Sequence, residues 1–222
     1  MRNVMATLLV GAAVAWSAWS ASASPDRPVP PVPPVSGAAA AAGLIDVRTV
    51  VPDAIVDLRY ATANNFVGEQ MYPADARCLV HQSIGPGLAA AAEALRTGGE
   101  VLVFWDCYRP RDVQVRMYDA VPEPGWVSHP TAYARSHEAG LSVDVTLARG
   151  GALVDMGTRF DEFVPRANAY ATDGVSATVQ ANRARLRDAL ARGGLRVYQG
   201  EWWHFDAPDA YADHPILDAP VN

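Results

Sequence analysis

The chain has 222 residues, of which 50% are hydrophobic and 19% are charged, and its formal net charge is −6. A mildly acidic chain without a basic stripe is a poor partner for nucleic acid or for an anionic membrane, so neither is expected. The length is enough for a single domain with a hydrophobic core.

The N-terminal residues 1–23 have the features of a secretory signal peptide. Arg2 supplies a basic start, an apolar stretch covers residues 4–18, and small residues form a cleavage site at the end. The Pro/Ala-rich segment 24–40 is expected to be a stiff linker, with a ligand for a proline-binding partner as the alternative. Residues 41–222 are expected to form one domain. We therefore expect export across the inner membrane to the periplasm, with no membrane attachment after cleavage.

The first predicted elements follow the linker in chain order. The segment 45–58 is rich in Val and Ile and predicts one or two short strands. Residues 88–96 predict a helix, because Pro86-Gly87 precedes them and Gly98-Gly99 follows. Residues 101–105 form a continuous apolar run, which predicts a buried strand.

The second half of the chain adds two helices and further strands. Pro110 predicts the first turn of a helix that ends near Ala120, and Ser176 predicts the cap of another that ends at Arg192. Further expectations are a loop at 121–133, a strand at 141–147, irregular chain at 148–175 and strands within 195–205. Because strands and helices mix without βαβ repetition, the predicted fold is a single α+β domain, with helices packed on an antiparallel central sheet.

Two cysteines occur, Cys78 and Cys107. An even pair in an exported chain could form a disulfide, which would stabilise the fold by about 3–4 kcal/mol in the chain-entropy model. Two buried thiols are the alternative, and the sequence does not choose between them because it does not supply the Cα separation.

Two short motifs carry most of the chemistry. The first contains His137 and Asp144, and the second contains Glu201 and His204. Two neutral imidazoles and one carboxylate are a typical ligand set of a catalytic zinc, and a further carboxylate can act as general base. The sequence therefore predicts a zinc hydrolase with its metal site at the sheet.

The spacing of these residues constrains their local structure. His137 and Asp144 are seven apart, so on one straight strand they would face opposite sides. Gly140 permits a turn, which places His137 on a loop and Asp144 on the strand. Glu201 and His204 are three apart in a segment of strand-forming aromatic residues, so we expect a strand with a local twist or bulge.

Arg109 is expected at the end of the buried strand. Its functional interpretation is stabilisation of the oxyanion that develops when water attacks a carbonyl group. The alternative is a structural ion pair with Asp106 or Asp112. The arginines of the last long helix are expected on its solvated face: Arg183, Arg185, Arg187 and Arg192.

Several motifs in one order resemble the D-alanyl-D-alanine dipeptidases of the vancomycin-resistance type, which are related to zinc D,D-carboxypeptidases. The resemblance covers residues 60–205. The matching motifs are Tyr60-Ala61-Thr62, Asn65-Phe66-Val67-Gly68, Tyr108-Arg109-Pro110, His137-x2-Gly140-x3-Asp144, Met156-Gly157-Thr158-Arg159-Phe160-Asp161, Asn182-Arg183-x-Arg185-Leu186-Arg187 and Glu201-Trp202-Trp203-His204.

The resemblance implies a role for each matching residue. His137, Asp144 and His204 would hold one zinc ion per chain, and the substrate would be a small D,D-dipeptide. Glu201 would be the catalytic base and Arg109 the carbonyl-polarising group. Tyr60 and Tyr72 fall where the family lines its substrate pocket.

Two positions depart from the family pattern. Arg135 stands where a small hydroxyl residue is usual, and Glu138 stands where a small residue is common. We expect both charges beside the substrate, paired to each other. Two other functions stay open: a periplasmic D,D-carboxypeptidase acting on longer wall peptides, and a non-catalytic module that binds wall peptides.

Overall fold

The computed structural model describes residues 31–123 and 125–222. The expected signal peptide and the first part of the expected linker lie outside this range. Residues 31–222 form one compact unit. Within the described part of the chain, no helix combines the length and the apolar character that a bilayer crossing requires.

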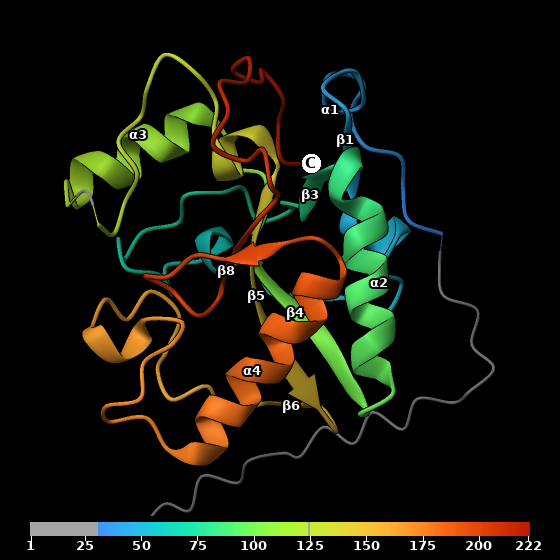
Figure 1. Ribbon diagram of the computed structural model, residues 1–222. Helices are drawn as coiled ribbons and strands as arrows, with labels where there is room; N and C mark the ends of the chain where they lie inside the picture. Colours follow the sequence, from blue (N-terminus) through green and yellow to red (C-terminus); the bar gives the residue numbers. More distant parts are fainter. Residues whose placement is uncertain (1–30, 124) are drawn as a thin grey trace, which may run out of the picture. The chain divides into compact units, whose positions relative to one another are not determined.

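The core of the unit is a six-stranded sheet (Figure 1). Its order is β2-β4-β5-β8-β7, with the short β6 beside β5. The strands are β2 (Ile55–Val56), β4 (Glu100–Asp106), β5 (Ser142–Arg149), β6 (Ala152–Leu153), β7 (Arg196–Val197) and β8 (His204–Asp206). All pairs are antiparallel except β2–β4, which is parallel. The predicted α+β fold with an antiparallel sheet is thus confirmed, apart from this one edge pair.

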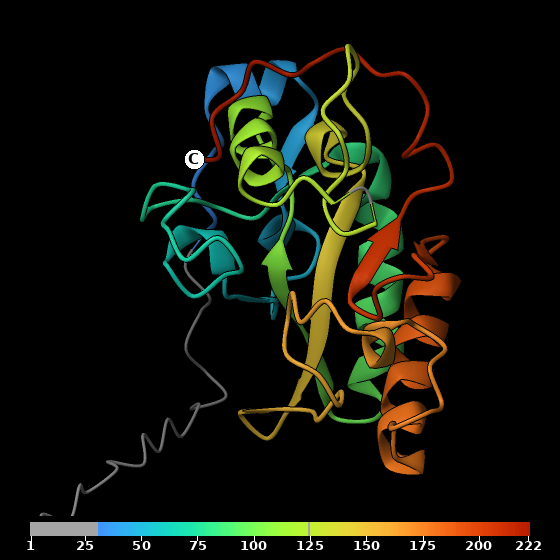
Figure 2. The ribbon, with the colours of Figure 1, turned by 90° about the vertical axis from the view of Figure 1, so that its left-hand side faces the viewer.

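Two long helices cover one face of the sheet (Figure 2). They are α2 (Gly85–Arg96) and α4 (Ala177–Arg192), and they pack against each other. Their closest approach needs glycine, because a Cβ atom at Gly87 would lie 2.1 Å from the carbonyl oxygen of Gly193. The predicted cap is present, since the Ser176 side chain accepts a hydrogen bond from the Val179 N–H.

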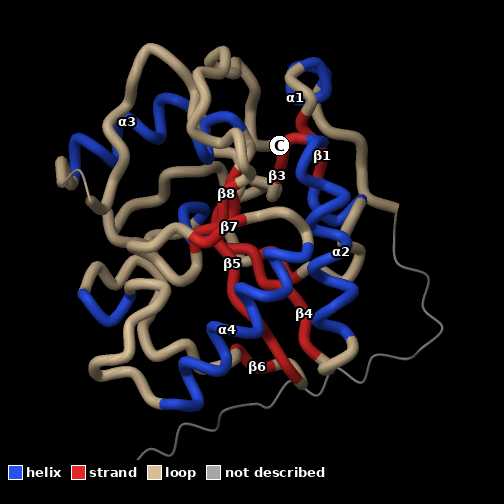
Figure 3. Tube along the Cα trace, viewed as in Figure 1, coloured by secondary structure: helices blue, strands red, loops and turns tan. Residues whose placement is uncertain are grey.

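The other face of the sheet lies under irregular chain, drawn as loop in Figure 3. Residues 154–176 contain only the short 3₁₀ turn η5 (Pro165–Ala167) as a named element. Arg183 fastens this segment to α4, because its guanidinium donates to the carbonyl oxygens of Met156, Arg166 and Asn168. The side chain is 1% exposed, so the prediction that it lies on the solvated helix face is wrong.

A second, two-stranded sheet pairs β1 (Leu44–Asp46) with β3 (Leu79–His81). The strand β3 was not predicted. The helix α1 (Gly37–Ala41) was not predicted either, because its residues were assigned to the linker. Ala39 is fully buried, so the packed part of the chain begins before residue 41.

The last helix, α3 (Arg111–Ala120), follows the end of β4 directly, as predicted. Pro110 is its N-cap rather than its first helical residue. Residues 121–133 form a loop beyond it, with residue 124 outside the described range. Residues of α3 and of this loop, among them Gln114, Met117 and Trp126, line the pocket described below.

Candidate metal centre and surrounding pocket

The three predicted metal ligands come together at adjacent strands. His137 lies in the 3₁₀ turn η4 (Ser136–Ala139), Asp144 on β5 and His204 at the start of β8. The register pairs Asp144 directly with His204. All three residues are buried, and one potential ligand atom from each lies within 4.8 Å of the others.

The distances between these atoms suit a tetrahedral ion. Nε2 of His137 is 3.1 Å from Nδ1 of His204 and 3.4 Å from Oδ1 of Asp144. Nδ1 of His204 is 2.9 Å from the same Oδ1 atom. Two ligands that each lie about 2.0–2.1 Å from a tetrahedral zinc are about 3.3 Å apart, so the cluster needs little rearrangement to hold one.

Hydrogen bonds on the far side of each ring fix the two tautomers. The Nδ1–H of His137 donates to the carbonyl oxygen of Cys107 at 2.7 Å. The Nε2–H of His204 donates to Oδ1 of Asp206 at 2.8 Å. The other two nitrogens, Nε2 of His137 and Nδ1 of His204, therefore face Asp144, as in many metal sites. Two imidazoles and a carboxylate that face one another in a buried space fit a cation.

Gly140 makes this arrangement possible, as predicted from the spacing. Its φ is +67°, and a Cβ atom there would lie 2.8 Å from the Leu44 side chain. Its N–H donates to the carbonyl oxygen of His137, which closes the turn η4. Any L-residue at this position would be both strained and crowded.

Glu201 lies in the turn that leads into β8 and lines the same pocket. The expected irregular strand is thus a turn followed by a strand, with Trp202 and Trp203 buried. Burial, together with the negative charge of Asp144, raises the pKa of Glu201 to about 8, against the lowering effect of His204 and Arg109. A carboxylate with a raised pKa has the proton affinity that a general base requires.

Arg109 is paired within the protein and is also part of the pocket wall. Its Nε and Nη2 atoms donate to Oδ2 of Asp106 at 3.0 and 2.7 Å, so the structural ion pair exists. The guanidinium also lines the pocket. Burial disfavours its charge, but Asp106 outweighs this effect and raises the pKa of Arg109 above its ordinary value.

The pocket around the cluster has a volume of about 490 Å³. Besides the cluster and Glu201, its wall includes charged and aromatic side chains. Those used below are Tyr60, Arg109, Trp126, Arg135, Glu138 and Asp161.

Comparison with known proteins then decides the family. The sequence model of the D-ala-D-ala dipeptidase family matches residues 40–222. The chain belongs to the D-ala-D-ala dipeptidase family. This confirms the resemblance drawn from its motifs.

Two curated relatives bear the name D-alanyl-D-alanine dipeptidase. One, from Escherichia coli strain K12, is 36% identical over 78% of this chain and 89% of its own length. The other, from Enterococcus faecium, is 32% identical over 72% of this chain and 91% of its own length. A solved vancomycin resistance D,D-pentapeptidase variant in complex with Zn(II) is 17% identical, with a TM-score of 0.37 over 61% of this chain and 82% of that one.

Two expectations about this family member's pocket are wrong. Tyr72 is buried beside the pocket rather than in its wall, and its hydroxyl donates to Oδ1 of Asp106 at 2.6 Å. Tyr72 thus positions the carboxylate that holds Arg109. Arg135 and Glu138 do not pair with each other: Arg135 pairs with Asp213, and Glu138 pairs with Arg111.

Asp161 and Asp206 belong to the site but were not predicted. The Tyr60 hydroxyl donates to Oδ2 of Asp161 at 2.8 Å, and burial together with Asp144 and Glu201 raises the pKa of Asp161 well above its usual range. Asp161 ends one of the family motifs, but nothing in its spacing shows that it faces Glu201. Asp206 follows His204 by two on a strand, which places both on one face. That signal could have identified it.

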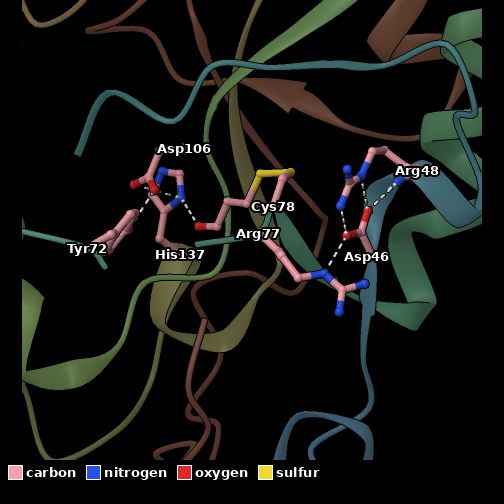
Figure 4. The surroundings of a disulfide bond; sticks show 8 residues. Asp46, Arg48, Tyr72, Arg77, Cys78, Asp106 and His137 are labelled. Carbon is pink, nitrogen blue, oxygen red and sulfur yellow. Dashed lines mark hydrogen bonds and ion pairs between the residues drawn. A yellow bond between two sulfur atoms is a disulfide. The ribbon is translucent and has the colours of Figure 1, made fainter. Parts of the chain in front are cut away.

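The two cysteines form a disulfide, so the first of the two alternatives is correct (Figure 4). It joins Cys78, beside β3, to Cys107, at the end of β4. The carbonyl oxygen of Cys107 is the acceptor for His137, so the bridge lies one hydrogen bond from the metal cluster.

Proposed function

We propose that the chain is a zinc metallopeptidase that hydrolyses D-alanyl-D-alanine or a related small cell-wall dipeptide. The observation that carries this proposal is the cluster of His137, Asp144 and His204, with both tautomers fixed and Glu201 in the same pocket. The names of the two curated relatives support the substrate.

The ligand set of two imidazoles and a carboxylate fits one zinc ion per chain, and zinc supplies Lewis acidity and a water of lowered pKa. Glu201 then accepts a proton from the attacking water as the new C–O bond forms. It delivers this proton to the nitrogen of the leaving amino acid as the peptide bond breaks. Arg109 donates hydrogen bonds to the carbonyl oxygen as negative charge develops there.

The remaining pocket residues hold the substrate in this proposal. A dipeptide carries an ammonium group at one end and a carboxylate at the other. The pocket offers both charges, since Arg135 and Glu138 lie in its wall together with Tyr60. Burial raises the pKa of Glu138, although Arg111 opposes this effect.

The proposed location is the periplasm. Residues 1–23 would be removed as a signal peptide, the linker would end before α1, and the enzyme would extend from α1 to residue 222. The Cys78–Cys107 disulfide supports an oxidising compartment, because such bonds rarely persist in the cytosol.

The test is amine release from D-Ala-D-Ala by the purified, zinc-loaded chain, compared with release from L-Ala-L-Ala. We expect release from the D,D-dipeptide only. Glu201→Gln should lower the rate by about 10²–10⁴-fold, the usual contribution of a general base. Zinc content, measured on the same samples, should be equal in both proteins.

Other outcomes would select the competing functions. Faster cleavage of a D-Ala-D-Ala-terminated pentapeptide than of the dipeptide would indicate a D,D-carboxypeptidase. Full zinc content without turnover, and without a difference between the chain and Glu201→Gln, would indicate a binding module. Equal release from both stereoisomers would contradict the proposed substrate.

A further inference from the structure

Three aromatic side chains form one wall of the pocket around the proposed metal site. They are Phe66, Trp126 and Phe163, and they line the same pocket as Glu201. Their rings follow one another in a row. The ring centroids of Phe66 and Phe163 are 5.3 Å apart, and those of Phe163 and Trp126 are 4.7 Å apart. These three residues are called the aromatic row below.

The aromatic row is accessible from the pocket, unlike the aromatic residues of the core. Each of its three residues is only partly buried. By contrast, Trp202 is 1% exposed and Phe205 is fully buried. Partly exposed rings leave apolar surface in contact with water, and covering that surface with an apolar group is favourable. The aromatic row therefore offers binding energy to an apolar part of a ligand.

The row begins beside the groups that would carry out the reaction. The ring of Phe66 lies 6.2 Å from the ring of Tyr60, measured between centroids. The guanidinium carbon of Arg109 in turn lies 5.5 Å from the centre of the Tyr60 ring. An apolar group on the row would thus be close to a peptide carbonyl group that Arg109 polarises.

Hydrogen bonds hold the chain segments that carry the row. The side chain of Asn65 accepts from two N–H groups of the turn that contains Phe66, at 2.9 and 3.0 Å. Nε2 of Gln114 donates to the carbonyl oxygen of Ser128 at 2.6 Å, in the loop that contains Trp126. The row therefore needs little ordering when an apolar group binds to it.

The pocket is larger than D-alanyl-D-alanine requires. Its volume of about 490 Å³ falls within the range of about 300–1,000 Å³ that is usual for the sites of drug-sized ligands. D-alanyl-D-alanine is much smaller than such a ligand, and its side chains are single methyl groups. It fills only part of the pocket and leaves apolar wall uncovered.

We propose that the aromatic row is the subsite for an apolar side chain of the substrate. The substrate class would be D,D-dipeptides in which one residue has a longer apolar side chain in place of the alanine methyl group. The occupant is part of the substrate rather than a separate ligand, because the row shares one pocket with Glu201 and the metal cluster. This inference rests on the proposed function, which supplies the D,D-dipeptide.

The test is the affinity of the zinc-loaded Glu201→Gln chain for three dipeptides, measured by isothermal titration calorimetry without turnover. The dipeptides are D-Ala-D-Ala, D-Leu-D-Ala and D-Ala-D-Leu. One of the two leucine-containing dipeptides should bind about tenfold more tightly than D-Ala-D-Ala, because its additional carbon atoms are buried against the row. The isomer that gains affinity identifies which residue of the substrate occupies the row.

Two further substitutions, made in the same Glu201→Gln chain, locate the subsite. Phe163→Ala removes the middle ring of the row, so the affinities for the two dipeptides should become nearly equal. The matched control is Tyr198→Ala. Tyr198 lines the same pocket and is 38% exposed, but it lies outside the row, so the affinity ratio should not change. If Phe163→Ala fails to fold, Trp126→Ala replaces it, with the same expected loss.

Three results would overturn the inference. They are affinity for both leucine-containing dipeptides no higher than for D-Ala-D-Ala, a preference that survives Phe163→Ala, and a preference that Tyr198→Ala removes. Hydrolysis by the unmodified chain tests the proposed function separately. Release from D-Ala-D-Ala without any preference for leucine overturns the inference alone, whereas a binding preference without release overturns the proposed activity alone.

Discussion

Two buried carboxylates, Asp46 and Asp144, differ in what surrounds them. Asp46 accepts hydrogen bonds from the Arg48 backbone and guanidinium and from Nε of Arg77, all between 2.7 and 3.0 Å (Figure 4). Asp144 instead faces Nε2 of His137 and Nδ1 of His204, whose other ring nitrogens contact Cys107 and Asp206. Arginines surround Asp46, whereas the two imidazoles of the proposed metal site surround Asp144.

This difference distinguishes a structural carboxylate from a proposed metal ligand by their surroundings alone. Burial makes an unpaired charge costly in both places. At Asp46 the cost is offset by two arginines, so the group stabilises the fold. At Asp144 the neighbours are the two imidazoles of the proposed metal site, so the same burial fits its proposed role as a ligand. The comparison predicts opposite consequences when each carboxylate is replaced by an amide.

The largest effect is expected from Asp144→Asn on zinc affinity. Structural sites with four protein ligands bind zinc with about 10–16 kcal/mol, or about 3–4 kcal/mol per ligand. The loss of one ligand should therefore weaken zinc binding by about 100- to 1000-fold. Competition with a chelating dye measures this affinity. Asp46→Asn is the matched control and should bind zinc as the unmodified chain does. Unchanged affinity in Asp144→Asn would remove it from the ligand set.

Asp46→Asn should instead lower the free energy of unfolding, by about 2–3 kcal/mol at neutral pH. This is less than the 3–5 kcal/mol typical of a broken buried ion pair, because the Arg48 side chain is 40% exposed and can turn to solvent. Urea denaturation of the metal-free proteins measures the loss. A loss below about 0.5 kcal/mol would show that the Asp46 cluster contributes little.

Asp206→Asn tests whether the carboxylate behind His204 tunes the cluster. The amide removes the charge that faces the Nε2–H, so the ring becomes a weaker donor to a metal ion. Zinc affinity should fall about 10- to 100-fold, less than for Asp144→Asn. The same dye competition measures it. A loss as large as that of Asp144→Asn would indicate that Asp206 is itself a ligand.

The smallest effect concerns the pH dependence of stability. Burial alone would raise the pKa of Asp46, but the hydrogen bonds from Arg48 and Arg77 outweigh it and hold the pKa below the ordinary 3.8. The stabilisation is therefore fully present above that value and is lost as the pH falls through the lowered pKa. The stability difference between the chain and Asp46→Asn should shrink only below about pH 4. A difference that shrinks between pH 5 and 7 would contradict this assignment.

Local sequence signals predicted most of the fold. Apolar runs, caps and flanking glycine and proline residues located β4, β5, α2 and α4, because these elements are long and clearly bounded in the sequence. The elements that were missed are short. The strand β3 has three residues, and α1 has five in a Pro/Ala-rich context that is typical of linkers. Only the packing of Ala39 and the pairing with β1 reveal them.

The candidate site was likewise predicted only in part from the sequence. The spacing within each motif predicted the local structure around His137 and Asp144, whereas the ligand chemistry and the family resemblance, not the spacing, joined them to His204. The ion-pair partners of Arg135 and Glu138 could not be predicted from the sequence, because Asp213 and Arg111 lie far from them along the chain. Charge neighbours of this kind depend on tertiary structure, and no short-range pattern encodes them.

Because of the disulfide, the geometry of the proposed metal site depends on the redox conditions in which the chain is produced. Cys107 is at once a cross-link to β3 and the acceptor that orients the ring of His137. A chain produced in a reducing cytosol keeps every ligand but loses the covalent tether behind that carbonyl group. Protein produced in the cytosol and protein produced in an oxidising compartment are therefore not equivalent. The oxidation state of the two cysteines should be measured together with the metal content of every preparation.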